Sequence, residues 1–114
     1  MKILNSFKYA LNGLKTTWRE EYNFRIEIFV ALLVAFFIVY FNFSFVESAL
    51  CIVTIIIVLT AEIVNTAIED LSDMVEPNQN PLIGKVKDTM AGFVLLSSAG
   101  AFILGCLVFW NHFI

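Results

Sequence analysis

Two long stretches of the chain contain no Asp, Glu, Lys or Arg: Ile28–Val46 and Thr89–Trp110. Each exceeds the roughly 18 residues that a helix needs to cross a bilayer. A third uncharged stretch, Ser48–Ala61, reaches membrane length only if its helix continues through Glu62 to about Ile68, for a length of about 31 Å. The pattern therefore predicts an all-α membrane protein, one domain over 1–114, with transmembrane helices at 26–46, 48–70 and 89–110.

The first 24 residues follow a different pattern, in which apolar and polar positions alternate with a helical period. An apolar face with basic residues opposite and a tryptophan near one end is typical of a helix that lies in the membrane interface. An amphipathic helix packed against other protein is the alternative. We expect an interfacial helix over 1–24, with an apolar face of Ile3, Leu4, Phe7, Leu11, Leu14 and Trp18 and a polar face of Asn5, Lys8, Asn12, Lys15 and Arg19.

Composition agrees with the membrane assignment. The chain is 60% hydrophobic and 15% charged, whereas soluble domains carry about 25% charged residues. This excludes a disordered tail and a nucleic-acid-binding module. Of the seven Lys and Arg residues, five precede the first uncharged stretch, and Lys85 and Lys87 lie between the second and third predicted spans. The positive-inside rule then places the N-terminus and the loop between these two spans, predicted at 74–85, in the cytoplasm and the C-terminus outside.

Polar residues line one side of the second predicted transmembrane helix. Glu62, Asn65, Glu69 and Asp73 fall within a sector of about 80° at the helical period. A carboxylate within a span is costly and by default indicates function. A polar contact between helices is the alternative. Four polar residues in register favour a functional site.

The spacing suits acid–base chemistry beside a cation. Glu62 is the deepest of the four, and a desolvated carboxylate is a better general base than one in water. Glu69, two turns nearer the cytoplasm, is placed to bind a hard cation such as Mg²⁺, which prefers one or two carboxylates together with substrate phosphates. Glu20 and Glu21, where the interfacial helix ends, offer a second carboxylate.

Basic residues lie on the same membrane face. Lys85 and Lys87 precede Asp88 at the start of the third span, and lysine neutralises phosphate oxygens. A base, a cation site and a phosphate lysine together indicate phosphoryl transfer. Gly84-Lys85 lacks the preceding glycine loop of a Walker A motif. A holin-like channel and an accessory subunit are alternatives from other functional classes. Neither alternative explains why Glu69 and Lys87 are present.

Taken together, these motifs closely resemble the signature of the prokaryotic diacylglycerol kinase and undecaprenol kinase family. The resemblance covers nearly the whole chain. Its elements are Glu62–Glu69, Asp73, Gly84–Asp88 and Ala91–Gly92, with Gly13–Lys15 and Trp18–Arg25 at the front. The resemblance implies a three-span homotrimer in the bacterial inner membrane that uses Mg²⁺ and transfers the γ-phosphate of ATP to a membrane lipid.

The resemblance also implies residue roles. Glu62 would be the general base, and Glu21 and Glu69 would hold the metal and thereby ATP. Other ATP contacts would come from Tyr9, Asn65, Asp73, Lys87 and Asp88, and the lipid headgroup would lie near Lys15, Arg25 and Glu27.

Two acceptor lipids are compatible with the motifs. Arg19–Asn23 and the Lys87-Asp88 pair followed by Ala91-Gly92 favour the undecaprenol kinase branch. The alternative is a diacylglycerol kinase that makes phosphatidic acid. The family loop often carries a Tyr-His pair where this chain has Gln79-Asn80.

Overall fold

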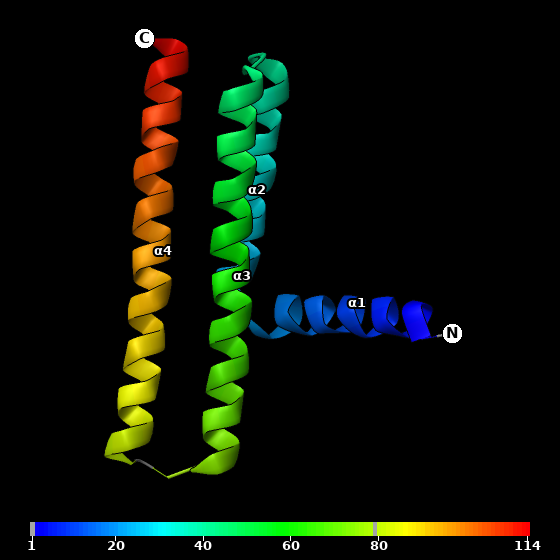
Figure 1. Cartoon of the computed structure of the whole chain (residues 1–114), viewed down its shortest axis with the longest axis vertical. Helices are drawn as coiled ribbons and strands as arrows, with labels where there is room; N and C mark the ends of the chain where they lie inside the picture. Colours follow the sequence, from blue (N-terminus) through cyan, green and yellow to red (C-terminus); the bar gives the residue numbers. More distant parts are fainter. Residues whose placement is uncertain (1, 79) are drawn as a thin grey trace.

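The computed structural model describes residues 2–78 and 80–114, and over these residues it consists of four helices without strands (Figure 1). Met1 and Gln79, which fall in the predicted interfacial helix and loop, lie outside the described residues. The all-α prediction is confirmed. The helices are α1 (Lys2–Glu20), α2 (Tyr22–Tyr40), α3 (Phe45–Val75) and α4 (Pro81–Phe113).

Helices α2, α3 and α4 run side by side, and α1 extends sideways from this bundle (Figure 1). All three bundle helices are long and apolar enough to cross a membrane. α3 contains 31 residues and is therefore about 46 Å long, which exceeds the roughly 30 Å of a bilayer core. One end of α3 must project from the hydrocarbon. α1 joins the bundle between the two ends of α3, so α3 and α4 continue past it toward their connecting loop.

The first connection differs from the prediction. The uncharged stretch predicts a helix over 26–46, but α2 ends at Tyr40 and α3 begins at Phe45. Asn42 adopts φ 57°, a left-handed conformation that asparagine tolerates better than most residues. Ser44 then caps α3: its Oγ accepts a hydrogen bond from Glu47 N (3.1 Å), and Glu47 Oε1 accepts one from Ser44 N (2.9 Å). This capping box starts a new helix within the stretch that hydrophobicity alone predicts to be one continuous helix.

The second connection is shorter than predicted. Helix α3 continues to Val75 and α4 begins at Pro81, so residues 76–80 join them rather than the predicted 74–85. Proline suits the first turn of a helix because it has no N–H to leave unpaired. Asn80 Oδ1 accepts a hydrogen bond from Leu82 N at 2.9 Å and caps the helix. The bilayer edges implied by 26–46, 48–70 and 89–110 stay predictions, because helix ends do not define them.

The buried core is small and lies toward the end of the bundle that carries the C-terminus. Phe43, Cys51 and Val108 form it, with Phe37 and Phe109 among the half-buried residues packed against it. Most large apolar side chains of the bundle are exposed. Apolar surface this extensive is suited to contact with lipid or with other copies of the chain.

A polar contact ties the two helices together at this end. Glu47, near the start of α3, is only 7% exposed. Its carboxylate accepts a hydrogen bond from Asn111 Nδ2 at 3.1 Å, and His112 Nδ1 lies 3.0 Å from Glu47 Oε1. The last turn of α4 is thereby fixed to the first turn of α3.

Candidate active site

Glu62 is buried where α3 passes the start of α2. Its exposed fraction is 3%, and the next turn of α3 is polar as well, with Thr66 Oγ1 donating a hydrogen bond to the Glu62 carbonyl at 2.9 Å. Across from it on α2, the Glu27 carboxyl lies close to the Glu62 carboxyl. Two acidic side chains from different helices therefore meet in a site shielded from solvent.

This acid pair is incompletely satisfied. Glu27 Oε2 is buried and has no hydrogen-bond partner within residues 2–78 and 80–114. Two ionised carboxylates this close repel each other unless a proton or a cation lies between them. A hydroxyl group that donates its proton to Glu62 would supply the hydrogen-bond donor that the pair lacks. A carboxylate placed to accept a hydroxyl proton is the arrangement of general-base catalysis.

A second acidic group lies at the corner between α1 and α2. Glu21 immediately precedes α2, and its neighbours on α3 include Glu69 and Asp70. Burial raises the pKa of Glu21 above its ordinary value, as do the negative charges of Glu69, Asp70 and Glu20. Four acidic side chains therefore lie close together at this corner, with Glu21 partly removed from solvent.

Asn65 adds a further oxygen to this group. Its Nδ2 donates to Glu69 Oε1 at 3.5 Å, while its Oδ1 is buried without a partner among the described residues. Carboxylate and amide oxygens are the donors that hard divalent cations prefer. Over the described part of the chain, no three His, Cys, Asp or Glu side chains are arranged to enclose a metal. Glu21, Glu69 and Asn65 could therefore supply only part of a cation's ligands, with the rest coming from a bound phosphate or water.

Lys87 approaches the acidic group from α4. Its Nζ lies 2.6 Å from Asp73 Oδ1, and it is close enough to Glu69 for their charges to interact. Lys87 and Asp88 also line a hollow of about 600 Å³ under the loop that joins α3 to α4. The structure therefore brings together five predicted ATP residues: Glu21, Asn65, Glu69, Asp73 and Lys87, with Asp88 beside them.

Three predicted residues have side chains that are exposed or bonded elsewhere in one chain. Tyr9 and Lys15 are exposed on α1, and Tyr9 lies about 18 Å along the helix from Glu21. Arg25 turns back to α1, where Nη1 donates to the carbonyls of Trp18 (3.0 Å) and Arg19 (2.9 Å). Their roles stay predictions, and Arg25 has a structural task that the sequence analysis missed.

Thr66 was also missed. It is 8% exposed and lies beside the Glu21 carboxylate. Its position one turn after Glu62, on the same face, is the signal that could have identified it.

The sequence was compared with known protein families and proteins. Residues 8–109 match the sequence model of a family described as prokaryotic diacylglycerol kinase. The chain belongs to this family. Prokaryotic diacylglycerol kinases are membrane kinases, and the buried acid pair, the oxygen-rich corner and the ion-paired lysine lie within the matched residues.

Individual relatives agree. The diacylglycerol kinase of Escherichia coli (strain K12) is 30% identical over 112 residues, which are 98% of this chain and 92% of that protein. The undecaprenol kinase of Bacillus subtilis (strain 168) is 31% identical over 95% of this chain and 88% of its own length. The diacylglycerol kinase of Synechocystis sp. is 32% identical over 93% of this chain and 62% of its own length.

Proposed function

We propose that this family member is a lipid kinase, which transfers the γ-phosphate of ATP to the hydroxyl of a membrane lipid with Mg²⁺ as cofactor. The observation that carries the proposal is the contact between two sites of different chemistry. A buried acid pair, Glu62 and Glu27, adjoins an oxygen-rich corner formed by Glu21, Asn65 and Glu69. One site suits a hydroxyl and the other suits a metal-bound phosphate.

In the proposed reaction, Glu62 accepts the proton of the lipid hydroxyl as the hydroxyl oxygen attacks the γ-phosphorus. The bond between the γ-phosphorus and the β–γ bridging oxygen breaks, and ADP leaves. Glu27 shares a proton or a hydrogen-bond donor with Glu62, so the two neighbouring carboxyl groups do not both carry an unscreened negative charge. Glu21, Glu69 and Asn65 would hold Mg²⁺, which when bound neutralises phosphate charge. Lys87 contributes a positive charge from α4, and Asp73 and Asp88 position it and the nucleotide.

The remaining predicted residues fit an assembly of several copies. Tyr9 and Lys15 lie on α1, which extends away from its own bundle (Figure 1). In a homotrimer, this helix would lie against a neighbouring copy and bring Tyr9 to ATP and Lys15 to a lipid headgroup. The site would face the cytoplasm at the bacterial inner membrane, with the C-terminus outside, as the distribution of Lys and Arg predicts.

The acceptor lipid is either undecaprenol or diacylglycerol. Sequence features around Arg19–Asn23 favour undecaprenol, and relatives with both names match this chain. A channel is disfavoured because a pore does not explain the Asp73–Lys87 ion pair or the acidic group around Glu21.

The test is incubation of the purified protein with labelled ATP, Mg²⁺ and separate preparations of diacylglycerol, undecaprenol and ceramide. We expect label in one lipid product, and none when a chelator removes the metal. Absence of labelled lipid with all three acceptors would contradict the proposal and favour the channel or subunit alternatives.

A further inference from the structure

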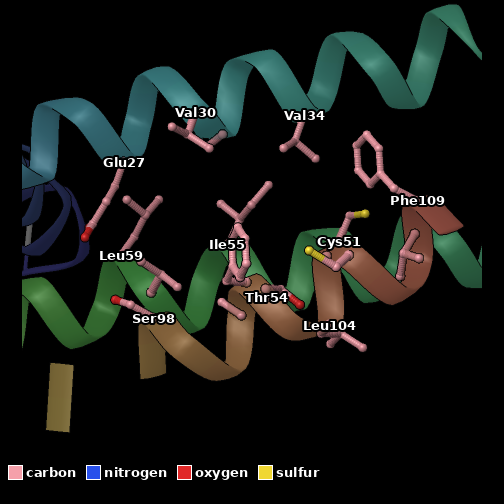
Figure 2. Close-up of a pocket in the computed structure, with 17 residues that line it drawn as sticks. Glu27, Val30, Val34, Cys51, Thr54, Ile55, Leu59, Ser98, Leu104 and Phe109 are labelled. Atoms are coloured by element: carbon pink, nitrogen blue, oxygen red, sulfur yellow. The ribbon is translucent and has the colours of Figure 1, made fainter. Parts of the chain in front are cut away.

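A groove of about 580 Å³ lies between α2 and α4, over one face of α3 (Figure 2). Its walls are almost entirely apolar, with Val30, Ile55 and Leu104 among the lining side chains. Thr54 is one of few polar exceptions, and its hydroxyl is already hydrogen-bonded to the Leu50 carbonyl at 2.6 Å. The groove therefore offers a ligand apolar contact along its length.

One end of the groove opens at the acid pair. Glu27 lines this end, and its side chain reaches from α2 toward α3 (Figure 2). Its buried Oε2 has no partner among the described residues, and its carboxyl adjoins that of Glu62. A ligand lying in the groove can thus present a hydroxyl to the carboxyl pair while the rest of the molecule stays in apolar surroundings.

The opposite end is closed by aromatic rings. Val34 and Phe109 line the groove there, and the ring of Phe37, one turn beyond Val34 on α2, meets the ring of Phe109 edge-on at 5.6 Å. Phe43 packs against Phe109 from the connecting turn at 5.3 Å. The hydrogen bond from Asn111 to Glu47 fixes this turn of α4, so the aromatic contact is held from both sides.

The distance between the two ends is informative. Glu27 to Val34 spans about 10 Å along α2, and Ser98 to Phe109 spans about 16 Å along α4. The hydrocarbon core of a bilayer is about 30 Å thick, so one leaflet is about 15 Å deep. The groove is therefore about as long as an ordinary acyl chain in one leaflet and far shorter than an undecaprenyl chain.

We propose that this groove binds one hydrocarbon chain of the acceptor lipid and that the Phe37–Phe109 contact sets the longest chain it accepts. The inference rests on the proposed lipid kinase function, because the hydroxyl end of the groove is the site of phosphorylation. It makes Phe109 a residue that determines specificity, and it favours a diacylglycerol-type acceptor over undecaprenol.

Binding is tested separately from turnover by photocrosslinking. The wild-type protein is irradiated with a dimyristoylglycerol that carries a diazirine at the end of one chain, and the modified residues are mapped by mass spectrometry. We expect adducts at the closed end, on Phe109 or its neighbours Val108 and Cys51. Adducts spread over lipid-exposed positions such as Phe29, without enrichment at the closed end, would overturn the proposal even if the protein phosphorylates lipid.

Chain-length specificity is tested with Phe109→Ala, and with Phe109→Leu as a variant that keeps an apolar side chain. Rates are measured with dioctanoyl-, dimyristoyl- and diarachidoylglycerol. Opening the end of the groove should raise kcat/KM for the diarachidoyl lipid, relative to the dimyristoyl lipid, by about threefold or more in Phe109→Ala and by less in Phe109→Leu. Phe29→Ala, on the exposed side of α2, is the matched control and should leave the ratio unchanged.

An unchanged ratio in Phe109→Ala, or an equal change in Phe29→Ala, would show that the aromatic contact does not limit chain length. Crosslinking at the closed end without phosphorylation of any lipid would leave the groove as a lipid site and contradict the kinase function. The two proposals can therefore fail independently.

Discussion

Lys87 on α4 forms an ion pair with Asp73 on α3, with Nζ 2.6 Å from Oδ1. The two side chains are 40% and 61% exposed, and exposed ion pairs contribute little to stability. Both residues are also predicted to contact ATP. We interpret the pair as holding the lysine beside the acidic corner until a nucleotide phosphate replaces the Asp73 carboxylate.

Substitution Lys87→Gln should separate binding from stability. We expect the affinity for Mg²⁺–ATP to fall by about tenfold or more, because a charge-assisted contact to phosphate is lost. The unfolding temperature should hardly change, since the ion pair is exposed. Calorimetric titration and thermal unfolding of the same sample measure the two effects. Lys85→Gln, two residues earlier, is the matched control; an equal loss of affinity there would indicate a general charge effect instead of a contact by Lys87.

Glu21 should make the metal-free protein sensitive to pH. Its pKa is raised by burial and by the carboxylates of Glu69, Asp70 and Glu20, so the folded protein holds this proton more tightly than the unfolded chain does. Ionised Glu21 therefore destabilises the fold above its raised pKa, and the penalty disappears as the pH falls below the value of the unfolded chain. Glu21→Gln should raise the unfolding temperature at neutral pH without metal, by an amount that shrinks at acidic pH.

The same variant should respond less to Mg²⁺–ATP, because Glu21 is a proposed ligand. Glu20→Gln, the preceding residue, relieves some repulsion but should keep the ligand-induced stabilisation. If Glu21→Gln lowered the unfolding temperature at neutral pH, or gained as much stability from Mg²⁺–ATP as the wild type, the assignment of this corner would be wrong.

The polar contact at the C-terminal end of α4 should support stability and not chemistry. Glu47→Ala removes the acceptor for Asn111, His112 and Ser44, so the unfolding temperature should fall. Glu47 lies about 22 Å along α3 from Glu62, so turnover of the folded enzyme should be preserved. His112→Ala should have a smaller effect that is not additive with Glu47→Ala, because the two side chains share one interaction. Additive losses would show that they act separately.

Arg25 can be assigned by the pattern of its kinetic effects. Its guanidinium donates to two carbonyls at the end of α1, and this should fix the corner that positions Glu21. Arg25→Gln should therefore lower kcat by a similar factor for every acceptor lipid and expose the corner to limited proteolysis. A rise in KM for lipid alone, with unchanged proteolysis, would instead support the headgroup contact that family resemblance predicts.

Much of the site could be predicted because it follows from one helix. Glu62, Asn65 and Glu69 recur at helical spacing, so their common face was evident from the sequence. The helix ends were less evident. Residues 41–43 are two phenylalanines around an asparagine, and their hydrophobicity concealed the turn. The Ser44-x-x-Glu47 pattern, a capping box, was the available signal.

Contacts between distant residues could not be predicted in the same way. Glu47 meets His112 across 65 positions, and Lys87 meets Asp73 only because the connecting loop is short. The hydrocarbon groove depends on how α2 and α4 diverge over α3, which no local pattern encodes. Arg25 has a conspicuous charge, but its partners are backbone carbonyls, which the sequence does not distinguish.

The most direct test of a general base at Glu62 beside a metal-bound ATP compares Glu62→Gln with Glu69→Gln in one preparation. Transfer of label from ATP to lipid and the affinity for Mg²⁺–ATP are measured for both variants. We expect Glu62→Gln to abolish transfer while binding Mg²⁺–ATP nearly as well as the wild type, and Glu69→Gln to lose affinity. Wild-type rates of lipid phosphorylation in Glu62→Gln would contradict the account.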